Sequence, residues 1–329
     1  MEYQSQEKIL SDVEKREFEN QIPDINAGYM PKIILFIFVF LLFLILFFSL
    51  NILSIVLKKV PANTKNIKSI EISILQRSKQ KTVYDFNNLI SYPKVDDYSA
   101  KSIVLFDINS NSIIFEKNSE QRNLVASLTK LASTKVIYES VDLEKLTTIT
   151  EESAKYDGSP LVLKSDQIFS NRDLLKASII VSNNQAIYAM QDSSQTVSQM
   201  KSYLKSLRLK NTNFSNPAGF DDNGDNYSTA KDLIPISKVF LDNPELKDYA
   251  GTVRSEIFDL NEFKSYRIVN TNELLRNDFY PVIAGKTGTT PRAGQNLMLL
   301  IEKNSRRYLI IIIGSAERYK DAMMLIDRI

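Results

Sequence analysis

The 329-residue chain contains neither histidine nor cysteine. Without histidine it cannot build a Ser-His-Asp triad or a histidine-ligated metal site, and without cysteine it has no thiol nucleophile and no disulfide. A nucleophilic hydrolase made from this sequence therefore needs serine or threonine as its nucleophile, with lysine, tyrosine, aspartate or glutamate as the base. The redox compartment stays open, because exported proteins also fold without disulfides.

The chain also lacks a concentration of positive charge. Its formal net charge is only +2, and its lysines are spread along the sequence. Nucleic-acid-binding proteins usually gather basic residues on one segment or face, so we predict no nucleic-acid partner. Hydrophobic residues make up 43% and charged residues 24% of the chain, which is typical of a folded domain with one additional apolar segment.

That apolar segment covers residues 33–57 and ends at Lys58 and Lys59. About 20 apolar residues suffice to cross the hydrocarbon core of a membrane, so the segment predicts one transmembrane helix. A cleaved signal peptide is the alternative, but its apolar core is normally about 7–15 residues long and lies near the N-terminus. We therefore predict a retained, single-pass anchor in the cell membrane.

The anchor divides the chain into four parts. Residues 1–32 are polar and charged and form a predicted N-terminal cytoplasmic tail, and residues 58–100 are rich in Lys, Asn, Ser and Asp and form a predicted stalk. Residues 101–329 alternate apolar and turn-forming stretches, as expected of a folded domain. We find no catalytic motif in the tail.

Within the domain, predicted strands lie at both ends and predicted helices lie between them. Residues 102–107 and 112–116 form a predicted hairpin, and a helix follows from residue 127 to about 138. Helical spacing recurs in pieces between 171 and 207; residues 281–286, 296–301 and 308–314 are extended, and a last helix covers about 320–327. This order predicts an α+β fold, with an antiparallel sheet built from both ends of the domain and a helical subdomain inserted.

Ser127 and Lys130 lie three residues apart at the start of the first predicted helix. Helix positions i and i+3 share a face, so the hydroxyl and the amine can touch, which makes Ser127 a candidate nucleophile and Lys130 its base. The spacing alone is weak evidence. Other Ser-x-x-Lys pairs begin at Ser5, Ser78, Ser91, Ser198, Ser202 and Ser228.

Two further motifs follow downstream in a fixed order. Ser182-Asn183-Asn184 is a Ser-x-Asn element, and Lys286-Thr287-Gly288 is the only Lys-Thr-Gly in the chain. Ser-x-x-Lys, Ser-x-Asn and Lys-Thr-Gly in this order are the signature of penicillin-binding proteins and serine β-lactamases. The order of the set, rather than any one motif, carries the inference.

The region from about residue 102 to 327 resembles the low-molecular-mass penicillin-binding proteins, the serine D-alanyl-D-alanine carboxypeptidases of peptidase family S11. Residues 226–233 (Asn-Tyr-Ser-Thr-Ala-Lys-Asp-Leu) look like the family's Ser-Thr-Ala-x-Asp-Leu segment. Residues 285–290 (Gly-Lys-Thr-Gly-Thr-Thr), followed by Ala293-Gly294, are similar to its Gly-Lys-Thr-Gly-x-Thr. The resemblance implies a β-lactamase/transpeptidase-like fold, with no metal and no cofactor.

The resemblance also implies how the nucleophile works. Ser127 would attack the carbonyl between two D-alanines and form an acyl-enzyme. Lys130 can act as base only while its amine is neutral, and burial together with a nearby cation such as Lys286 would lower its pKa. Ser182 would pass a proton toward the departing amine. These three residues, Ser127, Lys130 and Ser182, are the predicted catalytic set.

A second set is predicted to bind the substrate. Asn184 would bond both Lys130 and the substrate amide, and Lys286 and Thr287 on an edge strand would suit the terminal carboxylate. Gly288 allows backbone to approach backbone closely. In the family two backbone N–H groups hold the oxyanion, which correspond here to those of Ser127 and Thr289.

The chain departs from the family's pattern at three positions. Asn183 stands where the second motif usually has glycine, and we expect it to narrow the site. Val125 stands where proline is usual. Arg318 follows Gly314 by four residues, whereas the family's arginine comes soon after that glycine, so the sequence does not assign the substrate carboxylate to Arg318. Tyr188 is expected to be a packing residue.

The favoured function is a membrane-anchored D,D-carboxypeptidase that removes the terminal D-alanine from peptidoglycan stem peptides and is inhibited by β-lactams. A D,D-endopeptidase acting on cross-links, and a penicillin-binding sensor or scaffold without turnover, are the alternatives. A β-lactamase is disfavoured, because residues 213–219 contain no glutamate to serve as a deacylation base.

The predicted location follows from the substrate rather than from charge. Lysines after the anchor outnumber the basic residues just before it, which by the positive-inside rule would keep the domain in the cytoplasm. Long domains can cross the membrane regardless of charge, and the proposed substrate lies outside. We therefore expect an extracytoplasmic catalytic domain.

Overall fold

The computed structural model describes residues 93–221 and 226–329. The predicted tail, transmembrane helix and most of the stalk lie outside these residues. None of the helices in the described part combines the length and the apolar character that crossing a membrane requires.

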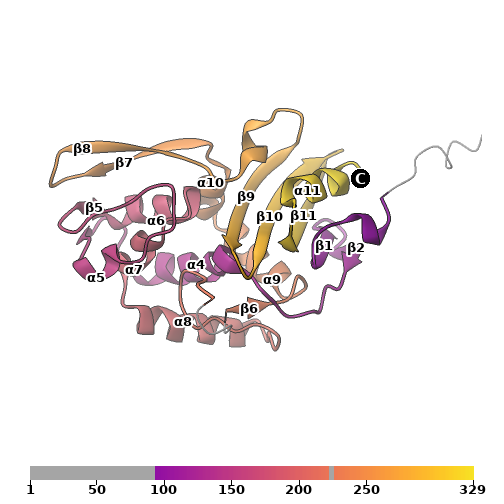
Figure 1. The fold of residues 1–329 in the computed structure, drawn as a ribbon, viewed down its shortest axis with the longest axis horizontal. Helices are drawn as coiled ribbons and strands as arrows, with labels where there is room; N and C mark the ends of the chain where they lie inside the picture. Colours follow the sequence, from indigo (N-terminus) through magenta and orange to yellow (C-terminus); the bar gives the residue numbers. More distant parts are fainter. Residues whose placement is uncertain (1–92, 222–225) are drawn as a thin grey trace, which may run out of the picture. The chain divides into compact units, whose positions relative to one another are not determined.

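The centre of the domain is a five-stranded antiparallel sheet (Figure 1). Its strands are β1 (Ser102–Asp107), β2 (Ser112–Lys117), β9 (Val282–Thr290), β10 (Gly294–Lys303) and β11 (Arg306–Ser315), in the spatial order β2-β1-β11-β10-β9. β1 pairs with β11 along its whole length, from Ser102 opposite Ile313 to Asp107 opposite Tyr308. The prediction of a sheet built from both ends of the domain is confirmed.

Both faces of this sheet are buried, because apolar residues occupy successive positions of its central strand. In β11, Leu309, Ile311 and Ile313 contact the helical side, whereas Ile310 and Ile312 contact the opposite side. Side chains alternate between the two faces of a strand, so an unbroken apolar run requires cover on both. Helix α11 (Arg318–Ile326) provides the cover on one side (Figure 1).

The other face carries the inserted helical subdomain. Polar side chains at the helix starts accept backbone N–H bonds, as Ser170, Asp192 and Asn243 do for α6, α8 and α10. Ser182 lies between α6 and α7, as predicted. The helices are α4 (Lys130–Ser140), α5 (Glu151–Ala154), α6 (Asn171–Ile180), α7 (Asn184–Met190), α8 (Ser193–Ser206), α9 (Leu233–Asp242) and α10 (Pro244–Gly251).

Smaller elements connect these layers. β3 (Asn123–Leu124) pairs with β6 (Tyr227–Ser228), β4 (Leu146–Thr148) with β5 (Ile168–Ser170), and β7 (Arg254–Asp259) with β8 (Lys264–Val269). Single 3-10 turns are η2 (Val95–Asp97), η3 (Ala126–Thr129) and η4 (Glu273–Arg276).

The last residues of the predicted stalk belong to the folded domain. Tyr98 and Ala100 are buried in the core beneath α11. Ser99 donates its backbone N–H and its hydroxyl to the buried carboxylate of Asp321 in α11. The segment before β1 therefore helps to fix the position of that helix.

Truncating the centre of the sheet should destabilise the domain strongly. Ile311 is fully buried and lies opposite Val104 and Met298, so Ile311→Ala should lower the free energy of unfolding by about 2–5 kcal/mol. Ile114 on the edge strand β2 is 46% exposed, and Ile114→Ala should cost under about 1 kcal/mol. Urea denaturation followed by circular dichroism measures both; equal losses would contradict this account of the core.

Candidate active site

Ser127 lies in η3, immediately before α4 begins at Lys130. Ala126 has a φ of 47°, a left-handed conformation that is uncommon for a residue with a side chain. Val125 occupies the position where the family usually has proline, and it is fully buried. Its carbonyl accepts a hydrogen bond from the N–H of Leu128 at 3.1 Å. The chain thus turns sharply here, and Ser127 stands at the turn with Lys130 one turn further on.

Lys130 is the centre of the site. Its side chain is 1% exposed, and Nζ donates to Ser127 Oγ at 3.0 Å, to Asn184 Oδ1 at 2.6 Å and to the carbonyl of Ala218 at 3.1 Å. All three partners are uncharged. Burial lowers the pKa of Lys130 to about 7. A substantial fraction of the amine is therefore neutral near neutral pH, as a general base requires.

The second motif reaches Lys130 through Asn184, the first residue of α7. Asn184 Nδ2 donates to the carbonyl of Asp157 at 2.6 Å, which directs Oδ1 toward the amine of Lys130. Ser182 adopts a left-handed backbone conformation, with φ 59°. Because of this turn, Ser182 and Asn184 contact two different lysines. Ser182 Oγ accepts a hydrogen bond from Lys286 Nζ, and Asn184 Oδ1 accepts one from Lys130 Nζ.

Asn183 does not point where we expected. Its side chain is fully buried, and Oδ1 accepts from the N–H of Ala186 and caps α7. Its Nδ2 donates to Ser159 Oγ at 2.8 Å and to the carbonyl of Leu161 at 2.7 Å. The extra amide therefore fastens the loop over residues 159–161 to the helix start instead of narrowing the site.

Lys286 in β9 is the second buried amine. Its Nζ donates to Ser182 Oγ at 2.7 Å and to the carbonyl of Thr287 at 2.9 Å. Burial, followed by the charges of Lys130 and Arg318, holds the pKa of Lys286 well below its usual value. The expected effect of a second cation thus falls on Lys286, whereas at Lys130 the lowering comes from burial alone. Protonation of the two amines is coupled, because like charges so close oppose each other.

The rest of the third motif forms the contact between β9 and η3. A Cβ at Gly288 would lie 2.7 Å from the backbone nitrogen of Ser127 and 3.1 Å from that of Leu128, so only glycine fits. Thr287 is buried, and its hydroxyl shares a 2.6 Å hydrogen bond with that of Thr271. Thr289 is exposed. The backbones of Ser127 and β9 are therefore adjacent, as two N–H groups sharing one oxyanion must be.

Sequence reasoning missed the third acceptor of Lys130, the carbonyl of Ala218. The loop of residues 216–220 is shaped by Asn216, whose Oδ1 accepts from the N–H groups of Gly219 at 2.8 Å and Phe220 at 3.0 Å. A Cβ at Gly219 would come within 2.0 Å of the Ala126 carbonyl. The Asn-Pro-Ala-Gly sequence indicates a turn, but nothing local says that this turn packs against Ser127 and Lys130.

Arg318, which the sequence did not assign to the site, lies beside Thr289. After β11 ends at Ser315, a two-residue bend leads directly into α11, which begins at Arg318. Its Nη1 donates to Thr289 Oγ1 at 2.7 Å and lies 3.4 Å from the carbonyl of Gly288. The bend and the helix start bring the guanidinium back to β9 despite the longer spacing from Gly314.

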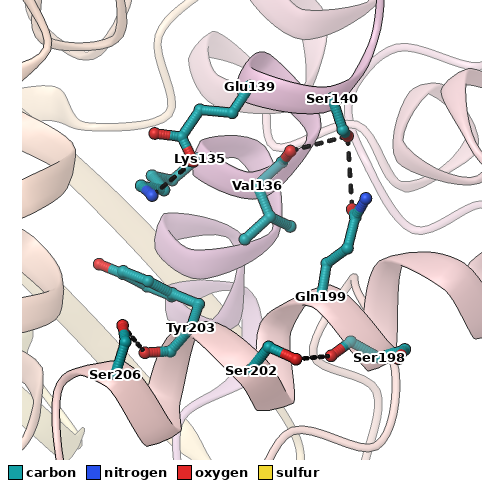
Figure 2. A pocket seen from close by; sticks show the side chains of 9 residues that line it. All are labelled: Lys135, Val136, Glu139, Ser140, Ser198, Gln199, Ser202, Tyr203 and Ser206. Carbon is teal, nitrogen blue, oxygen red and sulfur yellow. Dashed lines mark hydrogen bonds and ion pairs between the residues drawn. The ribbon is translucent and has the colours of Figure 1, made fainter.

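A surface pocket of about 360 Å³ lies between α4 and α8 and is separate from this site (Figure 2). Its polar side chains bond each other, for example Lys135 with Glu139 and Ser140 with Gln199. None of the residues that line it belongs to the three motifs. No group of three or more acidic residues in the described part of the chain is placed to hold a metal ion.

Comparisons with known proteins identify one family. The family model for D-alanyl-D-alanine carboxypeptidases (peptidase S11) matches residues 89–317. The chain is 30% identical over 244 residues to D-alanyl-D-alanine carboxypeptidase DacF of Bacillus subtilis strain 168, covering 70% of this chain and 62% of that protein. It is 32% identical over 237 residues to DacA of Haemophilus influenzae, covering 68% and 58%.

The fold has solved counterparts. The crystal structure of a D-alanyl-D-alanine carboxypeptidase from Mycobacterium tuberculosis H37Rv superposes with a TM-score of 0.65 at 23% identity, over 72% of this chain and 93% of that one. The matched region spans about 60% of the length of the curated relatives named above. The family model, the ordered motifs and the fold agree, and the chain belongs to the serine-type D-alanyl-D-alanine carboxypeptidase family, peptidase family S11.

Proposed function

We propose that this protein is a serine D,D-carboxypeptidase that removes the terminal D-alanine from peptidoglycan stem peptides through an acyl-enzyme on Ser127. The observation that carries the proposal is the convergence of three distant motifs on one buried cluster. Lys130 bonds Ser127 and Asn184, and Lys286 bonds Ser182 from the neighbouring strand. Family membership supports the same activity.

The contacts of Lys130 suggest how the serine is activated. A neutral amine keeps two N–H groups, which the oxygens of Asn184 and Ala218 can accept, and its lone pair then faces the hydroxyl of Ser127. Lys130 takes the hydroxyl proton while Ser127 Oγ bonds the carbonyl carbon between the two D-alanines. The backbone N–H groups of Ser127 and Thr289 receive the negative oxygen.

Release of D-alanine needs a proton on its nitrogen as the C–N bond breaks. Ser182 is suited to deliver it, because its hydroxyl is held by the amine of Lys286 at 2.7 Å. The proton that Lys130 took from Ser127 then replaces the one that Ser182 gave up, which leaves Lys130 neutral again. Water attacks the acyl carbonyl while Lys130 takes its proton, and Ser127 Oγ leaves and receives that proton back from Lys130. The side chains that move protons in these steps belong to two hydrogen-bonded pairs, Lys130 with Ser127 and Lys286 with Ser182.

The amine of Lys286 on β9 and the guanidinium of Arg318 on α11 suit the carboxylate of the terminal D-alanine. Lys286 is a buried amine, and Arg318 presents a guanidinium beside the exposed hydroxyl of Thr289. Charged hydrogen bonds of this kind orient a carboxylate and favour substrates that have one. Arg318 therefore joins Lys286, Thr287 and Thr289 as a proposed substrate-binding residue.

Location is part of the proposal. The apolar residues 33–57 would anchor the chain in the cell membrane, with residues 1–32 in the cytoplasm and the catalytic domain outside, where stem peptides occur. These segments lie outside the described residues, and their sequence composition alone supports the assignment.

The activity can be tested with a pentapeptide ending in D-Ala-D-Ala. The full-length protein should release free D-alanine, and Ser127→Ala should lower kcat/KM by about 10⁴-fold or more. Ser127→Ala should also abolish covalent labelling by a fluorescent penicillin. Lys130→Ala should lose both activities almost as completely.

Ser202→Ala is the matched control, because Ser202 and Lys205 form another Ser-x-x-Lys pair but lie on α8 away from the motifs. It should leave labelling and turnover unchanged. Persistent labelling of Ser127→Ala would refute the nucleophile. A stable penicillin adduct without release of D-alanine favours the sensor, and faster cleavage of cross-linked peptides favours the endopeptidase.

Acylation should depend on pH through Lys130. Because the pKa of Lys130 is lowered to about 7 and only the neutral amine accepts a proton, the rate of penicillin acylation should rise with pH through 7 and level off above about 8. Below pH 7 it should fall about tenfold per unit. Stopped-flow acylation at constant ionic strength measures this; a profile that is flat from pH 5 to 8 would contradict the assignment.

Replacing Arg318 should weaken recognition of the terminal carboxylate. Loss of one charged hydrogen bond predicts that Arg318→Leu lowers kcat/KM for the D-Ala-D-Ala peptide by about 10- to 100-fold. For a peptide that ends in D-alanine amide, Arg318→Leu should lower kcat/KM much less. Lys320→Leu, which removes only a surface pair with Glu317, should change neither value. Equal losses on both peptides would assign Arg318 a structural role instead.

A further inference from the structure

The bend between β11 and α11 is held by a residue from the other end of the domain. Ser99 precedes β1, 217 residues before Ala316 in the sequence. Its Oγ accepts hydrogen bonds from the backbone N–H groups of Ala316 and Glu317, each at 3.2 Å. Its own backbone N–H and its hydroxyl donate to Asp321 at 3.0 and 2.9 Å. Ser99 therefore fastens the bend to the helix that follows it.

Asp321 is the acceptor at the centre of this arrangement. It lies in the first turn of α11 and is only 1% exposed. Ser315 donates its hydroxyl to Asp321 at 2.7 Å, and Ser315 Oγ accepts from the N–H of Glu317 at 2.9 Å. A buried carboxylate that loses such a donor is left partly unsatisfied, at a cost in free energy. We call Ser99, Ser315 and Asp321 the hydroxyl clamp.

The hydroxyl clamp takes the place of an ordinary helix cap. The N-terminus of a helix is usually fixed by the side chain of the residue just before it. Glu317 occupies that position in α11, but in the described part of the chain its side chain makes no capping hydrogen bond and pairs instead with Lys320. The N–H groups of the bend therefore depend on the hydroxyls of Ser99 and Ser315.

Arg318 is the residue whose position the bend determines. It follows Glu317 directly, and its backbone N–H donates to Gln295 Oε1 at 3.2 Å. Its Nη1 donates to Thr289 Oγ1 at 2.7 Å. A guanidinium is a rigid, planar fork of N–H groups, so it binds a carboxylate well only in a defined orientation. A shift of the Arg318 backbone would therefore displace the fork from the place where the carboxylate is proposed to bind.

We propose that Ser99 is a positioning residue for recognition of the terminal carboxylate, because through the hydroxyl clamp it holds the bend that places Arg318 beside Thr289. This role rests on the proposed function, which assigns Arg318 to the carboxylate of the departing D-alanine. Ser99 acts through Arg318 and not by contact with the substrate. The end of the predicted stalk thereby contributes to substrate recognition.

The test compares two peptides with the full-length protein, one ending in D-Ala-D-Ala and one in D-Ala-D-alanine amide. The readout is the ratio of their kcat/KM values, carboxylate over amide, which a partly folded preparation does not alter. Ser99→Ala should lower this ratio at least about threefold, because a small displacement of a positioning group slows the substrate that needs it. Ser315→Ala should lower it too, whereas Ser99→Thr, which keeps the hydroxyl, should preserve it.

A double mutant distinguishes positioning of Arg318 from a general loss of stability. In an Arg318→Leu background, Ser99→Ala should not change the ratio further, because two residues that act through one group are not additive. Ser102→Ala is the matched control. Ser102 is fully buried and donates its hydroxyl to the carbonyl of Asn118 at 2.9 Å, so this variant loses a hydrogen bond at the start of β1 without altering the bend. It should keep the wild-type ratio.

An unchanged ratio in both Ser99→Ala and Ser315→Ala would overturn this role. An equal loss in Ser102→Ala, or a further loss in the Arg318→Leu background, would overturn it as well. If the wild-type protein cleaves both peptides equally well, the proposed function stands, and the roles of Arg318 and Ser99 are both wrong. Cleavage of neither peptide would remove the function and the role of Ser99 together.

Discussion

The burial of one amine governs the arrangement of this site. A lysine side chain removed from water is costly to keep charged unless its protons find acceptors. Lys130 meets this demand with three neutral oxygens, supplied by Ser127, Asn184 and Ala218. Those oxygens come from η3, from the start of α7 and from the loop of residues 216–220. The same contacts that satisfy the buried amine therefore also hold these three segments together at the candidate site.

The close approach of these segments explains the small and unusual backbone positions around them. Gly288 and Gly219 bring β9 and the loop of residues 216–220 into direct contact with the backbone at Ala126 and Ser127. Ala126 and Ser182 both accept left-handed conformations that cost free energy in an ordinary turn. Strain of this kind persists only where the surrounding packing fixes it, and here it aims two hydroxyls at two lysines.

Much of this could be predicted from the sequence because the signals are local. The apolar runs in β10 and β11, the hairpin of β1 and β2, and the spacing of Ser127 and Lys130 each depend on neighbours in the chain. The order of the three motifs then pointed to one fold and one chemistry. The sheet built from both ends and the helical insertion are present in the structure.

What could not be predicted depends on contacts between distant segments. A backbone carbonyl has no sequence signature, so Ala218 gave no sign of its role. Asn183 was expected in the site, but the need to cap α7 and to hold residues 159–161 determines its position. The four-residue spacing between Gly314 and Arg318 seemed too long for Arg318 to reach the site. The bend after β11 and the start of α11 nevertheless bring its guanidinium back beside β9.

The pairing of β1 with β11 has a consequence for how the domain folds. Ile103 lies opposite Ile312, so more than 200 residues must be synthesised before the first strand meets its partner. Contacts this far apart in the chain form slowly, because the entropy of closing so large a loop opposes them. The sheet against which Ser127 is positioned is therefore completed only when β11 has been made, and a partly synthesised chain cannot assemble the candidate site.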